Sequence, residues 1–84
     1  MDANFLLSQI ELREQLEGIK EQQDDLALDD FIEQVRDFTR DNITSISKAF
    51  TQSRDLQEIK TLVRELKFYE QLSKEANILM DEWL

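Results

Sequence analysis

The sequence predicts an all-α fold, an antiparallel three-helix bundle with up-down-up topology. The chain of 84 residues contains no proline and only one glycine, so few residues interrupt a helix. Apolar residues recur with helical spacing in three segments, which short polar stretches separate. Amphipathic helices with short connections pack as antiparallel neighbours. We expect residues 1–84 to form a single domain, because the chain is too short for two.

The first predicted helix runs from about Asp2 to Gln23. Successive residues lie about 100° apart around a helix axis. The stretch DDLALDD interrupts this helix, and Asp24 and Asp25 supply side chains that favour a turn and an N-cap. One stripe of the helix is predicted to face the core: Phe5, Leu12, Leu16 and Ile19.

The second predicted helix runs from about Leu28 to Phe50, with Asp29 and Asp30 in its first turn, where the helix dipole favours acidic residues. Thr39 and Asn42 interrupt its apolar face, and we expect each to bond to backbone or water. That face comprises Leu28, Phe31, Ile32, Val35, Phe38, Ile43, Ile46, Ala49 and Phe50.

The third predicted helix begins in the stretch TQSRD, with Ser53 as its N-cap, and continues close to the C-terminus. Its apolar direction drifts along the helix, as a near-heptad repeat does. The helix is long enough to extend beyond the other two, in which case Trp83 and Leu84 either cap the end of the bundle or lie exposed. Its predicted apolar positions are Leu56, Ile59, Leu62, Val63, Leu66, Tyr69, Leu72, Ala76, Leu79, Met80 and Trp83.

The composition argues against several classes of function. A formal net charge of −9 opposes binding to nucleic acid or to anionic membranes. The sequence has no histidine and no cysteine, which removes the commonest general base and the thiolate ligands of zinc sites. The carboxylates lie mostly outside the apolar stripes, where they are solvated. We therefore predict no enzyme activity, no catalytic residue, no metal site and no cofactor.

The first helix carries more apolar residues than one core-facing stripe needs. Relative to the core direction, Leu6 lies about 110° away, Ile10 about 150°, and Leu7 nearly opposite. Phe68 is a similar surplus residue on the third helix. Counting along the parallel first and third helices places it within about one turn of Ile10 in height. We expect Leu6, Ile10 and Phe68 to form one exposed apolar patch, with Glu11 and Glu14 at its border.

Four explanations of this surplus remain open from periodicity alone. The surface is a partner-binding site, it packs against a domain outside this sequence, it mediates self-association, or the first helix is buried more deeply than its stripe suggests.

The string FLLSQIELREQL, the later VRELKFYEQL and the spacing between them resemble the C-terminal domain of HscB-type J-protein co-chaperones. The resemblance covers nearly the whole chain. It implies a three-helix bundle that binds the IscU-type scaffold protein of bacterial iron–sulfur cluster assembly. It also implies a cytoplasmic protein. The scaffold-binding surface of the family would fall here on Leu6, Leu7, Ile10, Glu11, Glu14 and Phe68.

One departure from the full family pattern is large. A J-domain needs a His-Pro-Asp loop, and this sequence has neither histidine nor proline. We therefore expect a C-terminal fragment that lacks its J-domain, and the alternative is a stand-alone relative. The domain would reach an HscA-type chaperone only through the absent J-domain. The predicted function is a protein-binding module that presents the scaffold to the chaperone. The rival is a structural or oligomerisation bundle, with weak self-association or packing on a missing domain.

Overall fold

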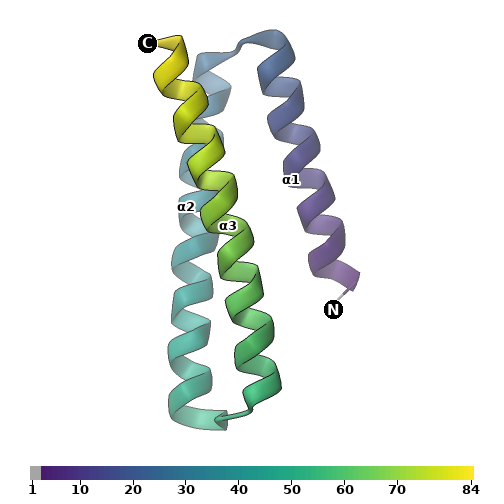
Figure 1. Ribbon diagram of the computed structural model, residues 1–84, viewed down its shortest axis with the longest axis vertical. Helices are drawn as coiled ribbons and strands as arrows, with labels where there is room; N and C mark the ends of the chain where they lie inside the picture. The colour runs from purple at the N-terminus through teal and green to yellow at the C-terminus, as the bar shows by residue number, and fades with distance from the viewer. Residues whose placement is uncertain (1–2) are drawn as a thin grey trace.

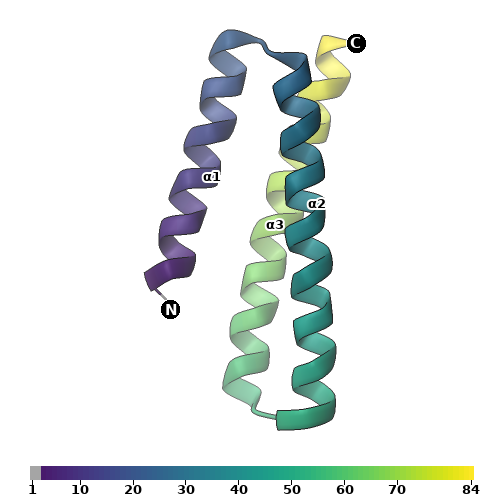
Figure 2. The same ribbon diagram turned by 180° about the vertical axis from the view of Figure 1, so that it is seen from behind.

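The computed structural model describes residues 3–84 and confirms the all-α, up-down-up bundle. The elements are α1 (Ala3–Gln22), α2 (Asp25–Lys48), a short π-helical turn η1 (Ala49–Ser53) and α3 (Leu56–Trp83). The molecule is elongated, with extents of 43 × 23 × 15 Å. The helices α2 and α3 form a long hairpin, and α1 lies against one side of it (Figures 1 and 2).

The first connection is a tight turn that ends in a helix cap. Gln23 has a left-handed backbone conformation with φ of 51°. The side chain of Asp24 accepts a hydrogen bond of 3.1 Å from the backbone N–H of Ala27, so the predicted cap is confirmed. Because this cap starts α2 at residue 25, Asp29 and Asp30 lie beyond the first turn, and that part of the prediction is wrong.

The second connection differs from the prediction in its cap. Asp55 is the N-cap of α3, and its side chain accepts a hydrogen bond of 2.9 Å from the backbone N–H of Gln57. Arg54 precedes it with φ of 53°. The predicted cap, Ser53, belongs instead to the π-helical turn, and its hydroxyl donates to a carboxylate oxygen of Glu58 at 3.0 Å. The helix therefore begins later than the sequence suggested.

The main core lies where all three helices meet, in the half of the bundle near the α1–α2 turn. Trp83 is partly buried and packs against this core, whereas Leu84 is exposed. Burying large aliphatic and aromatic side chains from three helices is what stabilises a bundle of this size. The buried cluster comprises Leu12, Leu16, Ile19, Leu28, Phe31, Ile32, Val35, Leu72 and Ala76.

Two polar residues lie along the contact between α2 and α3. The hydroxyl of Thr39 donates to the carbonyl of Val35 at 2.9 Å, as predicted. Asn42 is buried, and its amide donates at 3.3 Å to the carboxylate of Glu65 rather than to backbone. A buried polar side chain needs such a partner, and α3 supplies one for the amide N–H of Asn42, whereas its amide oxygen has no partner among the described residues.

The hairpin, not only α3, extends past α1. With 20 residues against 28 in α3, α1 stops part of the way along the hairpin (Figures 1 and 2). Four residues that the sequence placed on the apolar faces of α2 and α3 are exposed in the structure. They are Phe38 (37%), Ile43 (52%), Phe50 (56%) and Leu56 (69%).

Candidate functional site

The side of α1 that faces away from the core exposes three large aliphatic side chains. Leu6, Leu7 and Ile10 are 48%, 55% and 48% exposed. Glu11 and Glu14 are exposed beside them, and neither forms an ion pair with a residue that the structure describes. We call these five residues the α1 outer face. The core-facing residues of the same helix, Leu12, Leu16 and Ile19, are all buried.

Phe68 lies beside this face but not on an open surface. It is partly buried and packs against the core. Its ring meets the ring of Phe5 edge to face, with 5.9 Å between the centroids. The axis of α1 diverges from the hairpin towards its N-terminal end (Figures 1 and 2), and aromatic side chains fill the wedge. The sequence therefore placed Phe68 at the correct height but underestimated its burial.

Tyr69 joins the same aromatic cluster. Its ring stacks on that of Phe38 at 5.6 Å with 19° between the planes, and it contacts Phe5 edge to face. Burial, together with the nearby carboxylate of Glu65, raises the pKa of the Tyr69 phenol above its ordinary value. The cluster of Phe5, Phe38, Phe68 and Tyr69 thus ties the free end of α1 to both other helices.

Arg13 is a residue that the sequence reasoning did not single out. Its guanidinium carbon lies 5.5 Å from the centroid of the Phe68 ring, and its Nη1 donates to the Glu75 carboxylate at 3.1 Å. An exposed ion pair of this kind contributes little to stability, but the cation–π contact adds to it. In the sequence, only its position one helical turn after Ile10 indicates that Arg13 lies at the edge of the α1 outer face.

The chemistry of this site is that of a contact surface. No group of three or more His, Cys, Asp or Glu residues within 3–84 is arranged to hold a metal ion. No helix among the described residues is long and apolar enough to cross a membrane. A convex apolar surface bordered by unpaired carboxylates can bind by burial and by pairing with basic groups.

The comparisons with known proteins assign the chain to a family. Residues 1–77 match the model of the HscB C-terminal oligomerisation domain. The chain belongs to this HscB family. It is 37% identical over 79 residues to the co-chaperone protein HscB homolog of Photobacterium profundum. That match covers 93% of this chain and 46% of the relative, so the HscB-type domain spans about half the relative's length. No solved structure matches it significantly.

Proposed function

We propose that this HscB-type domain binds an IscU-type iron–sulfur scaffold protein through the α1 outer face. The observation that supports the proposal is the exposure of Leu6, Leu7 and Ile10 on a helix whose opposite side is anchored in the core. These residues coincide with the scaffold-binding positions that the family resemblance implies. An exposed apolar group with a charged border is the usual form of a protein-binding surface.

Binding would divide the work between apolar and charged residues. Leu6, Leu7 and Ile10 would be buried against the scaffold, and truncating such a side chain costs on the order of 1–3 kcal/mol. Glu11 and Glu14 would pair with basic residues at the border, which affects orientation and association rate more than affinity. Phe68 would contribute its accessible edge, and its packing would hold α1 in position.

The rest of the activity would come from outside this sequence. In this proposal a J-domain in the same protein engages an HscA-type chaperone and stimulates its ATPase. The helical domain would present the scaffold to that chaperone in the bacterial cytoplasm and would carry out no chemistry itself.

The test is a calorimetric titration of the domain with a purified IscU-type scaffold. The variant is the double change Leu6→Ala and Ile10→Ala, which avoids Phe68 because that ring also packs against the core. The matched control is Ile78→Ala, since Ile78 is 50% exposed and lies on α3. Circular dichroism would confirm that all three proteins remain folded.

We expect the double change to weaken binding by about 30-fold or more, because two such contacts are worth at least about 2 kcal/mol together. The control variant should bind like the wild type. Absence of binding by the folded wild-type domain would refute the proposal. Equal loss in Ile78→Ala would show that the α1 outer face is not the specific surface.

A further inference from the structure

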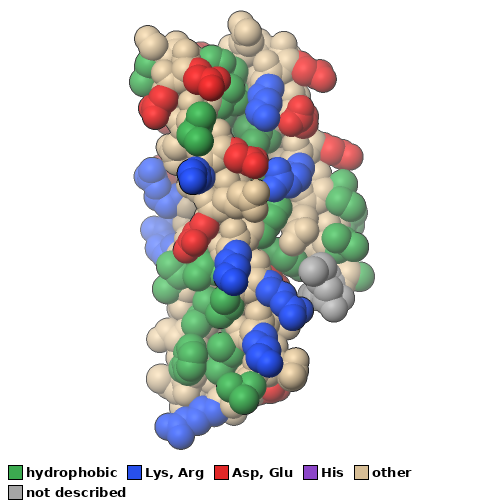
Figure 3. Space-filling model, viewed as in Figure 1, with side chains coloured by type: hydrophobic (Ala, Val, Ile, Leu, Met, Phe, Trp, Pro, Cys, Tyr) green, Lys and Arg blue, Asp and Glu red, His purple; other side chains and the backbone are tan. Residues whose placement is uncertain are grey.

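The uncovered end of the hairpin carries a second exposed apolar surface. Its largest members, Ile43, Phe50 and Leu56, are more than half exposed, and its other members are partly buried. Hydrophobic side chains gather over this part of α2 and α3 in the space-filling view (Figure 3). We call this surface the hairpin patch. Its members are Ile43 and Ile46 of α2, Phe50 of the π-helical turn η1, and Leu56, Val63 and Leu66 of α3.

Helical spacing places the hairpin patch on the side away from α1. The side of α2 that α1 covers is marked by Gln34, whose amide oxygen accepts a hydrogen bond of 3.3 Å from Gln15. Thr39 and Glu70 line a shallow depression between α2 and α3 on the opposite side. Ile43 follows Thr39, and Leu66 precedes Glu70, by one helical turn each, so the patch continues that opposite side.

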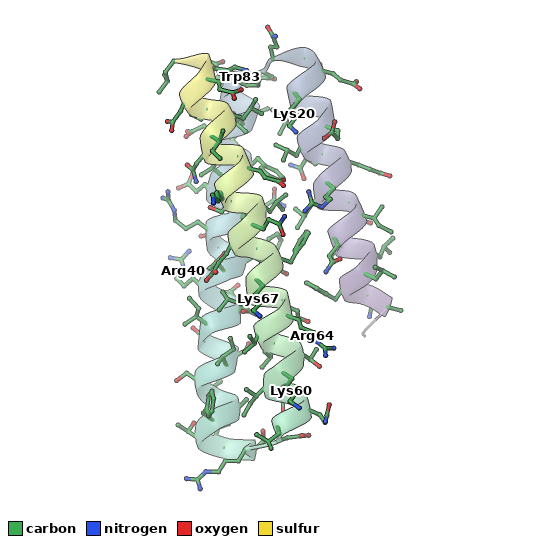
Figure 4. All side chains as sticks on the ribbon, viewed as in Figure 1. Lys20, Arg40, Lys60, Arg64, Lys67 and Trp83 are labelled. Carbon is green, nitrogen blue, oxygen red and sulfur yellow. The ribbon has the colours of Figure 1, made fainter. Side chains whose placement is uncertain are left out.

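Basic residues border the hairpin patch. Arg40 lies on the α2 edge, where its guanidinium pairs with the carboxylate of Asp37. On α3, the exposed side carries Lys60, Arg64 and Lys67 in succession (Figure 4). These three α3 residues form no ion pair with any residue between 3 and 84. Residues 42–68 contain five basic and three acidic residues, a formal charge of +2 in a chain of −9. The patch therefore lies in a cationic segment of an acidic protein.

The two apolar surfaces of the molecule are thus complementary in charge. The α1 outer face has two carboxylates at its border, whereas the hairpin patch has the three basic residues of α3 that form no ion pair among the described residues. If two molecules paired through the same surface on each, like charges would meet at the border, which is unfavourable. Pairing one with the other would bury apolar groups and join opposite charges at the border.

We propose that copies of this domain associate head to tail, with the α1 outer face of one copy on the hairpin patch of the next. The occupant of the hairpin patch is then a second copy of this chain. A heterologous contact of this kind continues from copy to copy unless it closes into a ring. The description of the matching family as an oligomerisation domain agrees with association, although it specifies neither surface. This contact needs no second protein, but it uses the same α1 outer face as the proposed scaffold binding, so that face cannot make both contacts at once.

Three isoleucines allow a matched test. They are exposed to nearly the same extent: Ile10 on the α1 outer face (48%), Ile43 on the hairpin patch (52%) and Ile78 outside both surfaces (50%). The variants are Ile10→Lys, Ile43→Glu and the controls Ile78→Lys and Ile78→Glu. Each would be examined by sedimentation equilibrium from micromolar to millimolar concentration, at about 0.15 M salt so that the overall net charges are screened beyond about 8 Å.

The wild type and both Ile78 variants should gain mass with concentration and exceed a dimer at the highest concentration. Ile10→Lys and Ile43→Glu should each remain near the monomer mass of 10.0 kDa, with association at least about tenfold weaker. An equimolar mixture of the two should form dimers and stop there, because each retains one intact surface.

Three results would overturn the proposal. One is a wild type that stays monomeric throughout the concentration range. Another is association that survives Ile43→Glu in a protein that circular dichroism shows to be folded. The third is a mixture of Ile10→Lys and Ile43→Glu that stays monomeric while the wild type associates, which would indicate symmetric pairing. Should Ile43→Glu unfold, Leu56→Glu tests the same patch, since Leu56 is 69% exposed.

Discussion

Replacing Phe68 by alanine should destabilise the domain, in contrast with its neighbours on the α1 outer face. A fully buried phenylalanine replaced by alanine costs about 3–5 kcal/mol. Phe68 is only partly buried, but it also loses the edge-to-face contact with Phe5 and the cation–π contact with Arg13. Those two contacts are worth about 0.5–1.5 and 0.5–1 kcal/mol. We therefore expect the free energy of unfolding to fall by at least about 2 kcal/mol for Phe68→Ala, because the ring is partly buried and makes both contacts.

Urea denaturation followed by far-UV circular dichroism measures this difference. The control is Ile10→Ala, because Ile10 is 48% exposed and should change the free energy of unfolding by less than about 0.5 kcal/mol. In a domain of this size the loss at Phe68 should lower Tm by roughly 10 °C. If Phe68→Ala is as harmless as Ile10→Ala, then the aromatic wedge between α1 and α3 does not hold the helices together in solution.

Three further changes test other parts of the fold. Val35→Ala should lower the free energy of unfolding by about 2 kcal/mol or more in a urea titration, because Val35 is fully buried; a loss below about 0.5 kcal/mol would contradict its place in the core. Gly18→Ala should raise it by up to about 1 kcal/mol, because a Cβ there would meet no atom within 4 Å; a thermal melt showing a lower Tm would contradict this. The raised pKa of Tyr69 contributes stability that is present below pH 10.0 and is lost as the pH rises through the folded-state value. Urea midpoints measured across that range should fall less in Tyr69→Phe than in the wild type, and identical profiles would count against the effect.

Helical periodicity predicted the three helices and much of the core because it depends on local spacing. Leu16 and Val35 fall on stripes that any packed neighbour would bury, and both are buried. Periodicity does not report which side of a helix its neighbours cover. Ile43 and Phe50 continue the apolar stripe of α2 on the side away from α1, so they resemble core residues in the sequence and are exposed in the structure.

For the candidate site, the sequence predicted the exposed residues of α1 but not the burial of Phe68. The exposure of Leu6, Leu7 and Ile10 follows from their angle to the core stripe of their own helix. The burial of Phe68 depends on the divergence of α1 and on where Phe5 points, which are tertiary properties. Asp55 rather than Ser53 is the N-cap of α3 because Ser53 belongs to the π-helical turn, and the local sequence did not predict that turn.

The divergence of α1 from the hairpin also has a consequence for motion. The first turns of α1 bury little beyond Phe5, whereas the later turns hold Leu12, Leu16 and Ile19 in the core. Segments with few buried contacts open locally at a lower free energy than the whole domain. Amide hydrogens near Leu6 should therefore exchange with solvent faster than those around Val35, and an NMR exchange experiment would measure the ratio. A partner bound to the α1 outer face would stabilise the first turns of α1 and slow the exchange of their amide hydrogens. Binding of the partner would therefore be coupled to the ordering of this part of α1.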